Sequence, residues 1–305
     1  MLTPGEERRM AVTGIFPALV TPYNQDESLN LTQLARHVRR VLDAGAHGVF
    51  CGGTNGEFYI QSHEERLAVL ETVVAEVAGA VPVVAGAGCI GTRDTVSLAQ
   101  RMAGRGADML SVISPYFAAA SQAELIAHFT AVADAVDIPV MVYNIPARTG
   151  VNITPATVAR LAEVDGIVGV KDSSGNFDQI LQYISVTEGT GFSVLAGSDS
   201  LILPNLLAGG TGAITAIANI YPRTMVEIYE KWASGDIEGA WKAQNSIRPI
   251  RNCLQLGNPN TVVKAATNAA GEPVGPCRAP FNLLSEAALE EIARTVASDH
   301  AKGMS

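Results

Sequence analysis

The sequence is short of lysine, and its overall charge is acidic. It has only five lysines against sixteen arginines, and four of the five lie beyond residue 230. The formal net charge is −9, and the basic residues do not cluster. Nucleic acid is therefore not an expected partner, because phosphate neutralisation needs a basic face.

The sequence also lacks a secretion signal, a long apolar run and paired cysteines. Residues 1–10 contain no run of signal-peptide length, and the most apolar segment, residues 73–90, is broken by Glu76, Gly79 and Pro82. The four cysteines are widely spaced with no C-x-x-C pair, which is typical of reduced thiols. We therefore expect a cytoplasmic protein with no membrane partner.

Signatures of metal and serine chemistry are missing as well. The five histidines never pair at the spacing of metal ligands, so no metal site is expected. No G-x-S-x-G pattern appears, which argues against a serine nucleophile on a strand-to-helix turn.

What the sequence does contain is an alternation of short apolar runs with amphipathic stretches. There are eight apolar runs, at residues 15–20, 48–51, 82–85, 109–113, 139–143, 167–171, 193–196 and 213–215. Several are β-branched without polar alternation, as expected for parallel strands covered on both faces. Helical patterns lie between them, at residues 31–44, 62–77, 92–104, 121–136, 154–163, 177–187 and 198–207. We predict an α/β fold, a (β/α)8 TIM barrel, with a doubly wound sheet as the alternative.

Beyond residue 222 the strand pattern stops and only helical patterns continue. They cover residues 223–256, with a dip at Gly235 and Asp236, and then residues 258–270 and 285–296. We therefore divide the chain into three parts: a tail at residues 1–12, the barrel at residues 13–235 and a C-terminal helical extension at residues 236–305.

Lys171 is the one lysine in the first 230 residues, and it ends an apolar run. In a barrel, chemistry belongs at the carboxyl ends of the strands. Burial there favours a neutral, nucleophilic amine, as a lysine needs when it attacks a carbonyl and forms a Schiff base. Tyr143 ends the preceding strand, 28 residues earlier, so we expect it beside Lys171 as a general acid or base. The alternatives are a lysine that reaches solvent and an ordinary buried tyrosine.

A glycine-rich loop follows the second strand. Its residues 52–56 (GGTNG) offer successive backbone N–H groups, which can form a nest for a carboxylate or a phosphate. Thr54 adds a hydroxyl that can relay a proton. The alternative is a glycine-rich turn with no ligand.

A second glycine-rich segment, residues 86–91 (GAGCIG), matches the G-x-G-x-x-G pattern of dinucleotide-binding proteins. That pattern needs an acidic residue at the end of the next strand to hold the ribose, and Asp108 stands at the beginning of that strand instead. We therefore expect no nucleotide cofactor.

Three motifs together resemble the dihydrodipicolinate synthase and N-acetylneuraminate lyase family. They are residues 53–57 (GTNGE), 143–150 (YNIPARTG) and 169–172 (GVKD), in this order. The resemblance runs over nearly the whole chain, from residue 14 to residue 289. It implies a barrel with a C-terminal helical cap, usually assembled as a homotetramer. It also implies metal-free class I aldolase chemistry on pyruvate, with no cofactor other than the covalent Schiff base.

The resemblance also implies a role for each matching residue. Lys171 would form the Schiff base with pyruvate, and Tyr143 would move the proton to and from the reacting oxygen. The loop after Gly53 would hold the pyruvate carboxylate through the N–H groups of Thr54 and Asn55, and the Thr54 hydroxyl would join the proton relay. Two further residues would line the pyruvate pocket, Gly197 and Ile214.

Departures from the family pattern bear on the substrate. Dihydrodipicolinate-forming members have Thr-Thr where this chain has Thr54 and Asn55, and Tyr-Tyr where it has Tyr116 and Phe117. The second of those tyrosines reaches across a dimer contact to complete a proton relay, and Phe117 has no hydroxyl.

Arg148, in contrast, favours dihydrodipicolinate synthesis, because it resembles the arginine that meets a substrate carboxylate in the synthases. The wider motifs are closer to 4-hydroxy-2-oxoglutarate and 2-keto-3-deoxy acid aldolases. We therefore predict a lyase that reversibly cleaves a hydroxylated 2-keto acid to pyruvate and an aldehyde. The alternatives are dihydrodipicolinate synthesis from pyruvate and aspartate semialdehyde, a deoxy-keto sugar acid dehydratase, and an inactive barrel that senses a 2-keto acid.

Overall fold

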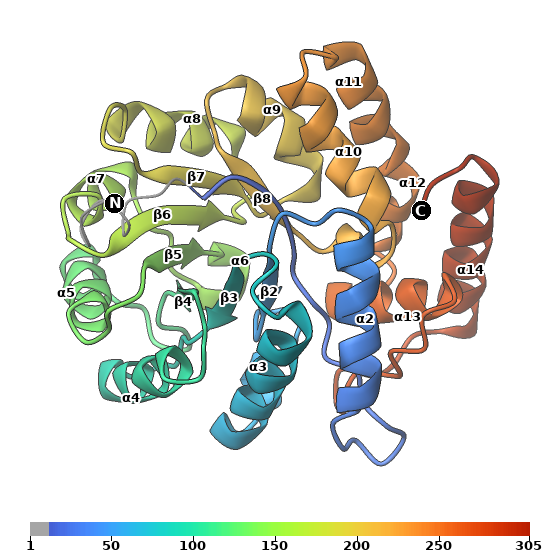
Figure 1. Ribbon diagram of the computed structural model, residues 1–305, viewed down its shortest axis with the longest axis horizontal. Coiled ribbons are helices and arrows are strands. Elements are labelled where there is room, and N and C mark those ends of the chain that lie inside the picture. The colour runs from blue at the N-terminus through green and yellow to red at the C-terminus, as the bar shows by residue number, and fades with distance from the viewer. Residues whose placement is uncertain (1–11) are drawn as a thin grey trace. The chain divides into compact units, whose positions relative to one another are not determined.

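The computed structural model describes residues 12–305, and Figure 1 labels most of their helices and strands. The predicted N-terminal tail, residues 1–12, lies outside the described residues except for Val12. The Val12 N–H donates a hydrogen bond to Ser193 Oγ at 2.9 Å.

Eight strands form one sheet. They are β1 (Gly14–Pro17), β2 (Val49–Cys51), β3 (Val83–Gly86), β4 (Met109–Ile113), β5 (Val140–Asn144), β6 (Ile167–Asp172), β7 (Ser193–Ala196) and β8 (Gly212–Thr215). Every residue in these strands is buried, which is why their sequences show apolar runs without alternation. The order β1-β8-β7-β6-β5-β4-β3-β2 follows the chain and returns from β8 to β1. The predicted TIM barrel is confirmed, and the doubly wound alternative is wrong because the strand order has no reversal.

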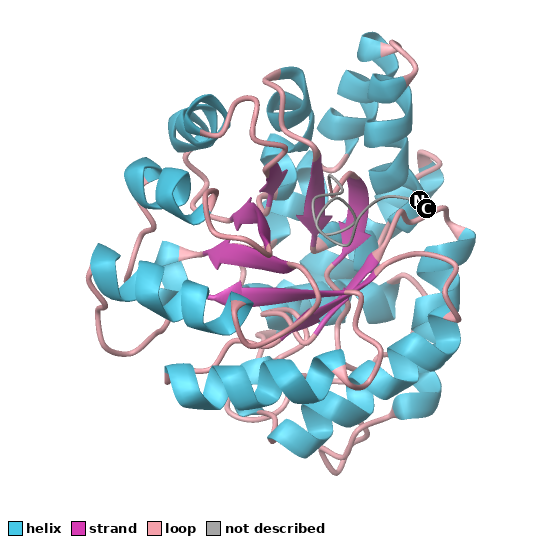
Figure 2. Cartoon of the chain, turned by 60° about the vertical axis from the view of Figure 1, so that its left-hand side comes forward, coloured by secondary structure: helices cyan, strands magenta, loops and turns pink. Residues whose placement is uncertain are grey.

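Helices cover the strands on their outer side (Figure 2). They are α2 (Leu31–Asp43), α3 (His63–Val77), α4 (Thr92–Ala103), α5 (Gln122–Ala133), α7 (Pro155–Leu161), α8 (Phe177–Val186) and α9 (Ile202–Leu207). A capping box opens α3, since Ser62 and Glu65 exchange side-chain and backbone hydrogen bonds. The sequence patterns did not indicate the short α6 (Pro146–Thr149), whose four residues are too few to show a helical period.

The last part of the chain is helical, as predicted. It contains α10 (Pro222–Ala233), α11 (Ile237–Ser246), α12 (Arg248–Cys253), α13 (Pro259–Ala269) and α14 (Glu286–Ala301). The predicted dip separates α10 from α11, because Gly235 has a φ of +85° and Asp236 caps α11. The domain boundary at residue 235 stays a prediction.

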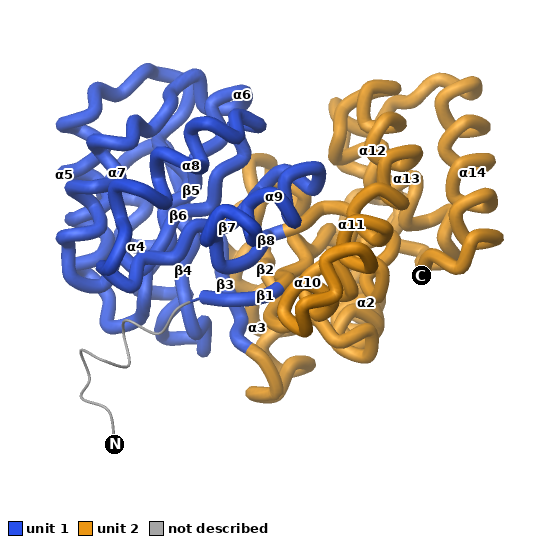
Figure 3. The backbone as a smooth tube through the Cα atoms, turned by 90° about the horizontal axis from the view of Figure 1, so that it is seen from above, with its two compact units in different colours: residues 1–14, 82–214 blue, residues 15–81, 215–305 orange. Residues whose placement is uncertain are grey.

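Two compact units make up the chain (Figure 3). Of the described residues, the first unit comprises 12–14 and 82–214, with β3 to β8 and the helices α4 to α9. Within it each strand from β3 to β7 pairs in parallel with the strand that follows it. The second unit comprises residues 15–81 and 215–305, with β2, α2, α3 and α10 to α14.

None of the helices in residues 12–305 combines the length and the apolar character that crossing a membrane would require. The four cysteines are all buried thiols.

Candidate active site

Lys171 and Tyr143 lie directly opposite each other, on β6 and β5 of the first unit. Both side chains are buried, with exposed fractions of 4% and 3%. The Lys171 Nζ atom lies over the tyrosine ring, 4.0 Å from its centroid. The predicted juxtaposition is confirmed: an amine and a phenol meet in a buried place at the carboxyl ends of two strands.

An irregularity in the sheet produces this pairing. Val140 pairs with Ile167, but the next residue, Met141, pairs with Gly169, so Val168 is an extra residue in β6. Without it the register would place Tyr143 opposite Val170 and turn Lys171 to the other face. The bulge therefore brings the amine and the phenol to the same side of the sheet.

Two glycines near Lys171 allow close packing with the neighbouring backbone. At Gly169, a Cβ atom would lie 2.6 Å from the Ser193 carbonyl oxygen, so no side chain fits there. At Gly197, just after β7, a Cβ atom would lie 3.0 Å from Lys171 Cε and 2.9 Å from the Asp172 carbonyl oxygen. The predicted pocket residue Gly197 therefore packs against the lysine stem.

A buried polar network holds the strand ends next to this pair. Asn144 is opposite Asp172 in the register and donates a hydrogen bond to its Oδ1 atom at 2.8 Å. Gln179 donates to the same oxygen at 3.0 Å, and the Ile153 N–H donates to Asn144 Oδ1 at 3.0 Å. Burial raises the pKa of Asp172, and the hydrogen bonds that it accepts oppose that effect. The sequence pattern indicated the strand ends but not this network, which depends on how the neighbouring β5 and β6 segments pack.

Three other predicted site residues also belong to the first unit. Ile214 is buried on β8, with an exposed fraction of 1%. Arg148 is exposed on α6, a few residues after β5. Phe117 follows β4 and is 98% exposed, and its φ of +77° is unusual for a residue with a side chain.

The predicted carboxylate-binding loop belongs to the second unit and follows β2. Gly52 has a φ of +65°, and a Cβ atom on Gly53 would lie 2.4 Å from the Phe50 ring, so the loop needs glycine at both positions. Thr54 and Asn55 are half-buried.

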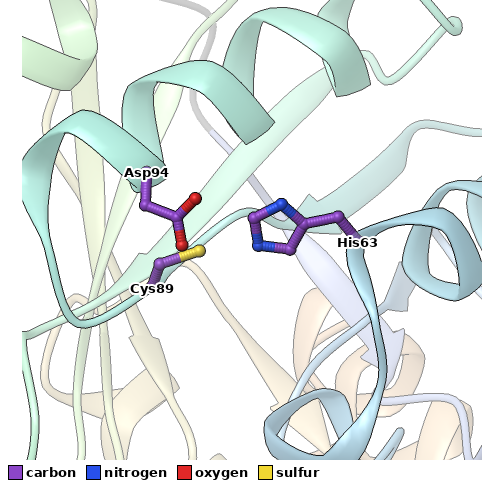
Figure 4. Close-up of side chains that lie close together, drawn as sticks. All are labelled: His63, Cys89 and Asp94. Atoms are coloured by element: carbon purple, nitrogen blue, oxygen red, sulfur yellow. The ribbon is translucent and has the colours of Figure 1, made fainter.

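The G-x-G-x-x-G segment has the predicted strand-turn-helix context, with Gly86 ending β3 and Gly91 preceding α4. Its buried Cys89 exchanges backbone hydrogen bonds with the Thr95 hydroxyl, at 3.1 Å to the N–H and 3.3 Å to the carbonyl. These bonds attach the segment to the first turn of α4, which is a structural role that needs no ligand. Figure 4 draws Cys89 together with two other side chains of metal-binding type, Asp94 from α4 and His63 from α3. The absence of a metal requirement stays a prediction.

Comparison with known proteins decides the family. A model of the dihydrodipicolinate synthetase family matches residues 11–299. The chain belongs to this family. Its TIM-barrel fold agrees with that membership.

The similarity extends over nearly the full length of individual members of the dihydrodipicolinate synthetase family. An uncharacterized DapA-like lyase of Halobacterium salinarum is 41% identical, over 94% of this chain and 95% of that protein. A 4-hydroxy-tetrahydrodipicolinate synthase of Methanopyrus kandleri is 40% identical, over 93% of this chain and 95% of that protein. The structure of YagE, an E. coli K12 prophage protein of the dihydrodipicolinic acid synthase family in complex with pyruvate, has a TM-score of 0.91. It is 34% identical, over 94% of this chain and 98% of that chain. The protein is therefore a lyase of this family.

Proposed function

We propose that the protein is a class I aldolase that reversibly cleaves a hydroxylated 2-keto acid to pyruvate and an aldehyde. The observation that carries the proposal is the buried Lys171 amine, 4.0 Å from the centroid of the Tyr143 ring. An amine in this setting is suited to Schiff-base formation, and the adjacent phenol is suited to proton transfer. The pyruvate bound to YagE supports the choice of the keto acid.

In the proposed reaction, Nζ of Lys171 attacks the C2 carbonyl of the keto acid, and loss of water leaves a protonated imine. The C3–C4 bond then breaks, and its electron pair moves toward the imine to give an enamine. The proton of the C4 hydroxyl passes through the Tyr143 oxygen, and the aldehyde leaves. Protonation at C3 and addition of water release pyruvate and restore the lysine. The protonated imine accepts the electron pair of the broken C3–C4 bond, so the scheme uses no cofactor.

The N–H groups of Thr54 and Asn55 are our candidates for binding the substrate carboxylate, with the Thr54 hydroxyl in the proton relay. The family resemblance supports these roles, as does the loop itself, whose glycine at Gly53 brings the backbone close without a side chain. Gly197 and Ile214 are proposed to line the pyruvate, and Arg148 is proposed to meet the far end of the substrate.

The second candidate is dihydrodipicolinate synthesis from pyruvate and aspartate semialdehyde. The name of the relative from Methanopyrus kandleri and the presence of Arg148 favour it. Against it stands Phe117, which offers no hydroxyl to a proton relay. We keep aldol cleavage as the first candidate for this reason, with a deoxy-keto sugar acid dehydratase as a further alternative.

We also propose that the protein forms a homo-oligomer, either a dimer or a tetramer. Phe117 is a large aromatic side chain almost wholly exposed, on a backbone conformation that costs energy. Contact with a second copy would remove that side chain from water. A cytoplasmic location remains part of the same prediction.

Borohydride reduction in the presence of pyruvate, read by mass spectrometry, tests the central step. We expect one reduced adduct on Lys171 in the wild type and none in Lys171→Ala. Lys242→Ala, on the exposed side of α11, is the matched control and should keep the adduct. An adduct that survives Lys171→Ala contradicts the proposal.

The substrate is tested by two assays on the same preparation. We expect pyruvate release from hydroxylated 2-keto acids and little condensation of pyruvate with aspartate semialdehyde. Efficient condensation without release would favour the synthase.

A further inference from the structure

Glu57 closes the loop after β2 and is a buried carboxylate that the proposed reaction does not use. Its side chain has an exposed fraction of 0%. Its φ of +59° is left-handed, a conformation that non-glycine residues rarely adopt unless their surroundings impose it. Its N–H donates a hydrogen bond to the Thr54 carbonyl oxygen at 3.1 Å. Glu57 therefore connects a constrained backbone turn to the residue proposed to bind the substrate.

Both oxygens of the Glu57 carboxylate have partners in the C-terminal part of the same unit. Lys264 of α13 forms an ion pair with Glu57, with its Nζ atom 2.6 Å from Oε1, and its side chain is 1% exposed. The Arg278 N–H donates to Oε2 at 3.0 Å. Lys264 also donates to the Pro276 carbonyl at 2.9 Å and lies 4.1 Å from the centroid of the Tyr23 ring. Burial lowers the pKa of Lys264, and the Glu57 charge opposes that effect.

The Thr54 carbonyl oxygen is held from two directions. It accepts the Glu57 N–H and also the side-chain amide of Asn260, at 2.7 Å, and Asn260 stands one turn before Lys264 on α13. The Thr54 carbonyl and the Asn55 N–H belong to one planar trans peptide group, so they point in opposite directions. Fixing the carbonyl toward α13 therefore fixes the Asn55 N–H away from α13.

A buried ion pair adds little net stability, because desolvation of the two charges offsets most of their attraction, and an apolar pair of similar volume is often as stable. Stability alone thus gives no reason for a carboxylate and an ammonium at this place. Geometry gives one, because Oε2 accepts a backbone N–H and Oε1 lies against the Lys264 ammonium, so the carboxylate is held at both ends.

We infer that Glu57 is a positioning residue that, anchored by Lys264, fixes the Thr54 peptide and so aims the Asn55 N–H at the substrate carboxylate. The inference rests on the proposed function of this loop. Removing the anchor should weaken the binding of the carboxylate and leave the chemistry at Lys171 largely intact.

The test compares Glu57→Gln with a control, Glu65→Gln. Glu65 also pairs with Arg278, but it lies on α3 and has a more exposed side chain, and glutamine can keep its place in the capping box. The readout is the rate of borohydride trapping as a function of pyruvate concentration. For Glu57→Gln we expect the half-saturating concentration to rise about tenfold or more, since a hydrogen bond to a charged group is weakened. The maximal rate should stay within about twofold of wild type, and Glu65→Gln should match wild type in both.

A half-saturating concentration for Glu57→Gln equal to that of Glu65→Gln would overturn the inference. So would a fall in the maximal rate alone, because that would place Glu57 in the chemistry. If Glu57→Gln does not fold, the double variant Glu57→Gln/Lys264→Met makes the same comparison, since it leaves no unpaired buried charge.

Hydrogen exchange separates this inference from the proposed function. If the wild type forms no adduct with pyruvate, the proposed function is wrong, and exchange at residues 52–57 still decides the positioning role. Faster exchange there in Glu57→Gln than in Glu65→Gln supports that role. Equal exchange in the two variants overturns it.

Discussion

Gly197→Ala is the smallest change that disturbs the proposed nucleophile, because it adds one methyl group to a backbone position in contact with Lys171. The new Cβ atom would lie 3.0 Å from Lys171 Cε, 2.9 Å from the Asp172 carbonyl oxygen and 2.0 Å from Ser173 Oγ. The serine hydroxyl can rotate away. The carbonyl cannot, because it accepts the N–H of residue 197 itself, at 2.7 Å.

The size of the effect follows from those distances. Relief of the contact with Lys171 Cε to an ordinary separation of about 3.5 Å moves the end of the side chain by about half an ångström. Overpacking of this kind costs about 1–3 kcal/mol of unfolding free energy. A misplacement of about 1 Å at a reacting group costs on the order of a hundredfold in rate, so we expect about a tenfold loss in the rate of adduct formation.

Gly104→Ala is the matched control, since it makes the same chemical change in the same unit. Gly104 has a helical conformation at the end of α4, and a Cβ atom there would meet its nearest neighbour at 3.5 Å. The control should be neutral or stabilised by up to about 1 kcal/mol. Urea denaturation and the initial rate of borohydride trapping with pyruvate give the two readouts. If Gly197→Ala traps pyruvate at the wild-type rate, close packing at Gly197 does not hold Lys171 in its reacting position.

Two further predictions concern proton transfer and acid stability. Tyr143→Phe should reduce turnover about a hundredfold or more, whereas Phe117→Leu should change it much less, since only Tyr143 carries a hydroxyl; equal losses would mean that Tyr143 is not the proton carrier. Burial lowers the pKa of His37 from 6.5 to about 4, and its Nε2 lies 2.9 Å from Asn219 Oδ1. The unfolded chain thus binds the extra proton first, and stability is lost as the pH falls from 6.5 toward 4, by about 2 kcal/mol at pH 5. Urea denaturation at about pH 7.5 and about pH 5 should show a smaller acid loss in His37→Gln than in wild type or in the His63→Gln control, and an unchanged loss would contradict the assignment.

Most of the fold could be predicted from the sequence because its signals are local. All eight apolar runs correspond to strands, with ends within a few residues, since each run is buried on both faces. The helical pattern predicted over residues 62–77 corresponds to α3 and its N-cap Ser62, because a helical period is also a local signal. Features that depend on a partner strand were not predictable. The extra residue Val168 in β6 is one of them, because nothing in the β6 sequence shows where β5 will end.

The candidate site divides in the same way. Lys171 and Tyr143 stood out by composition and spacing, and the structure places them opposite each other. The spacing of 28 residues, however, left their register open by one residue, and only the bulge puts both on the same face. Glu57 gave no signal of its own beyond a place in a motif, because its meaning depends on Lys264, more than 200 residues away.

The two halves of the proposed chemistry are positioned by different physical means. Around Lys171 the constraint is close packing, since Gly169 and Gly197 let backbone atoms approach where no side chain fits. Around Thr54 the constraint is polar, with a buried ion pair and two donors on one carbonyl oxygen. Added volume disturbs a position that is held by close packing, whereas removal of a charge disturbs a position that is held by an ion pair. A methyl group at residue 197 should therefore act on the rate of adduct formation, and a neutral amide at residue 57 on the pyruvate concentration required. If instead the change at residue 197 altered the pyruvate concentration required and the change at residue 57 altered the rate of adduct formation, both assignments would be wrong.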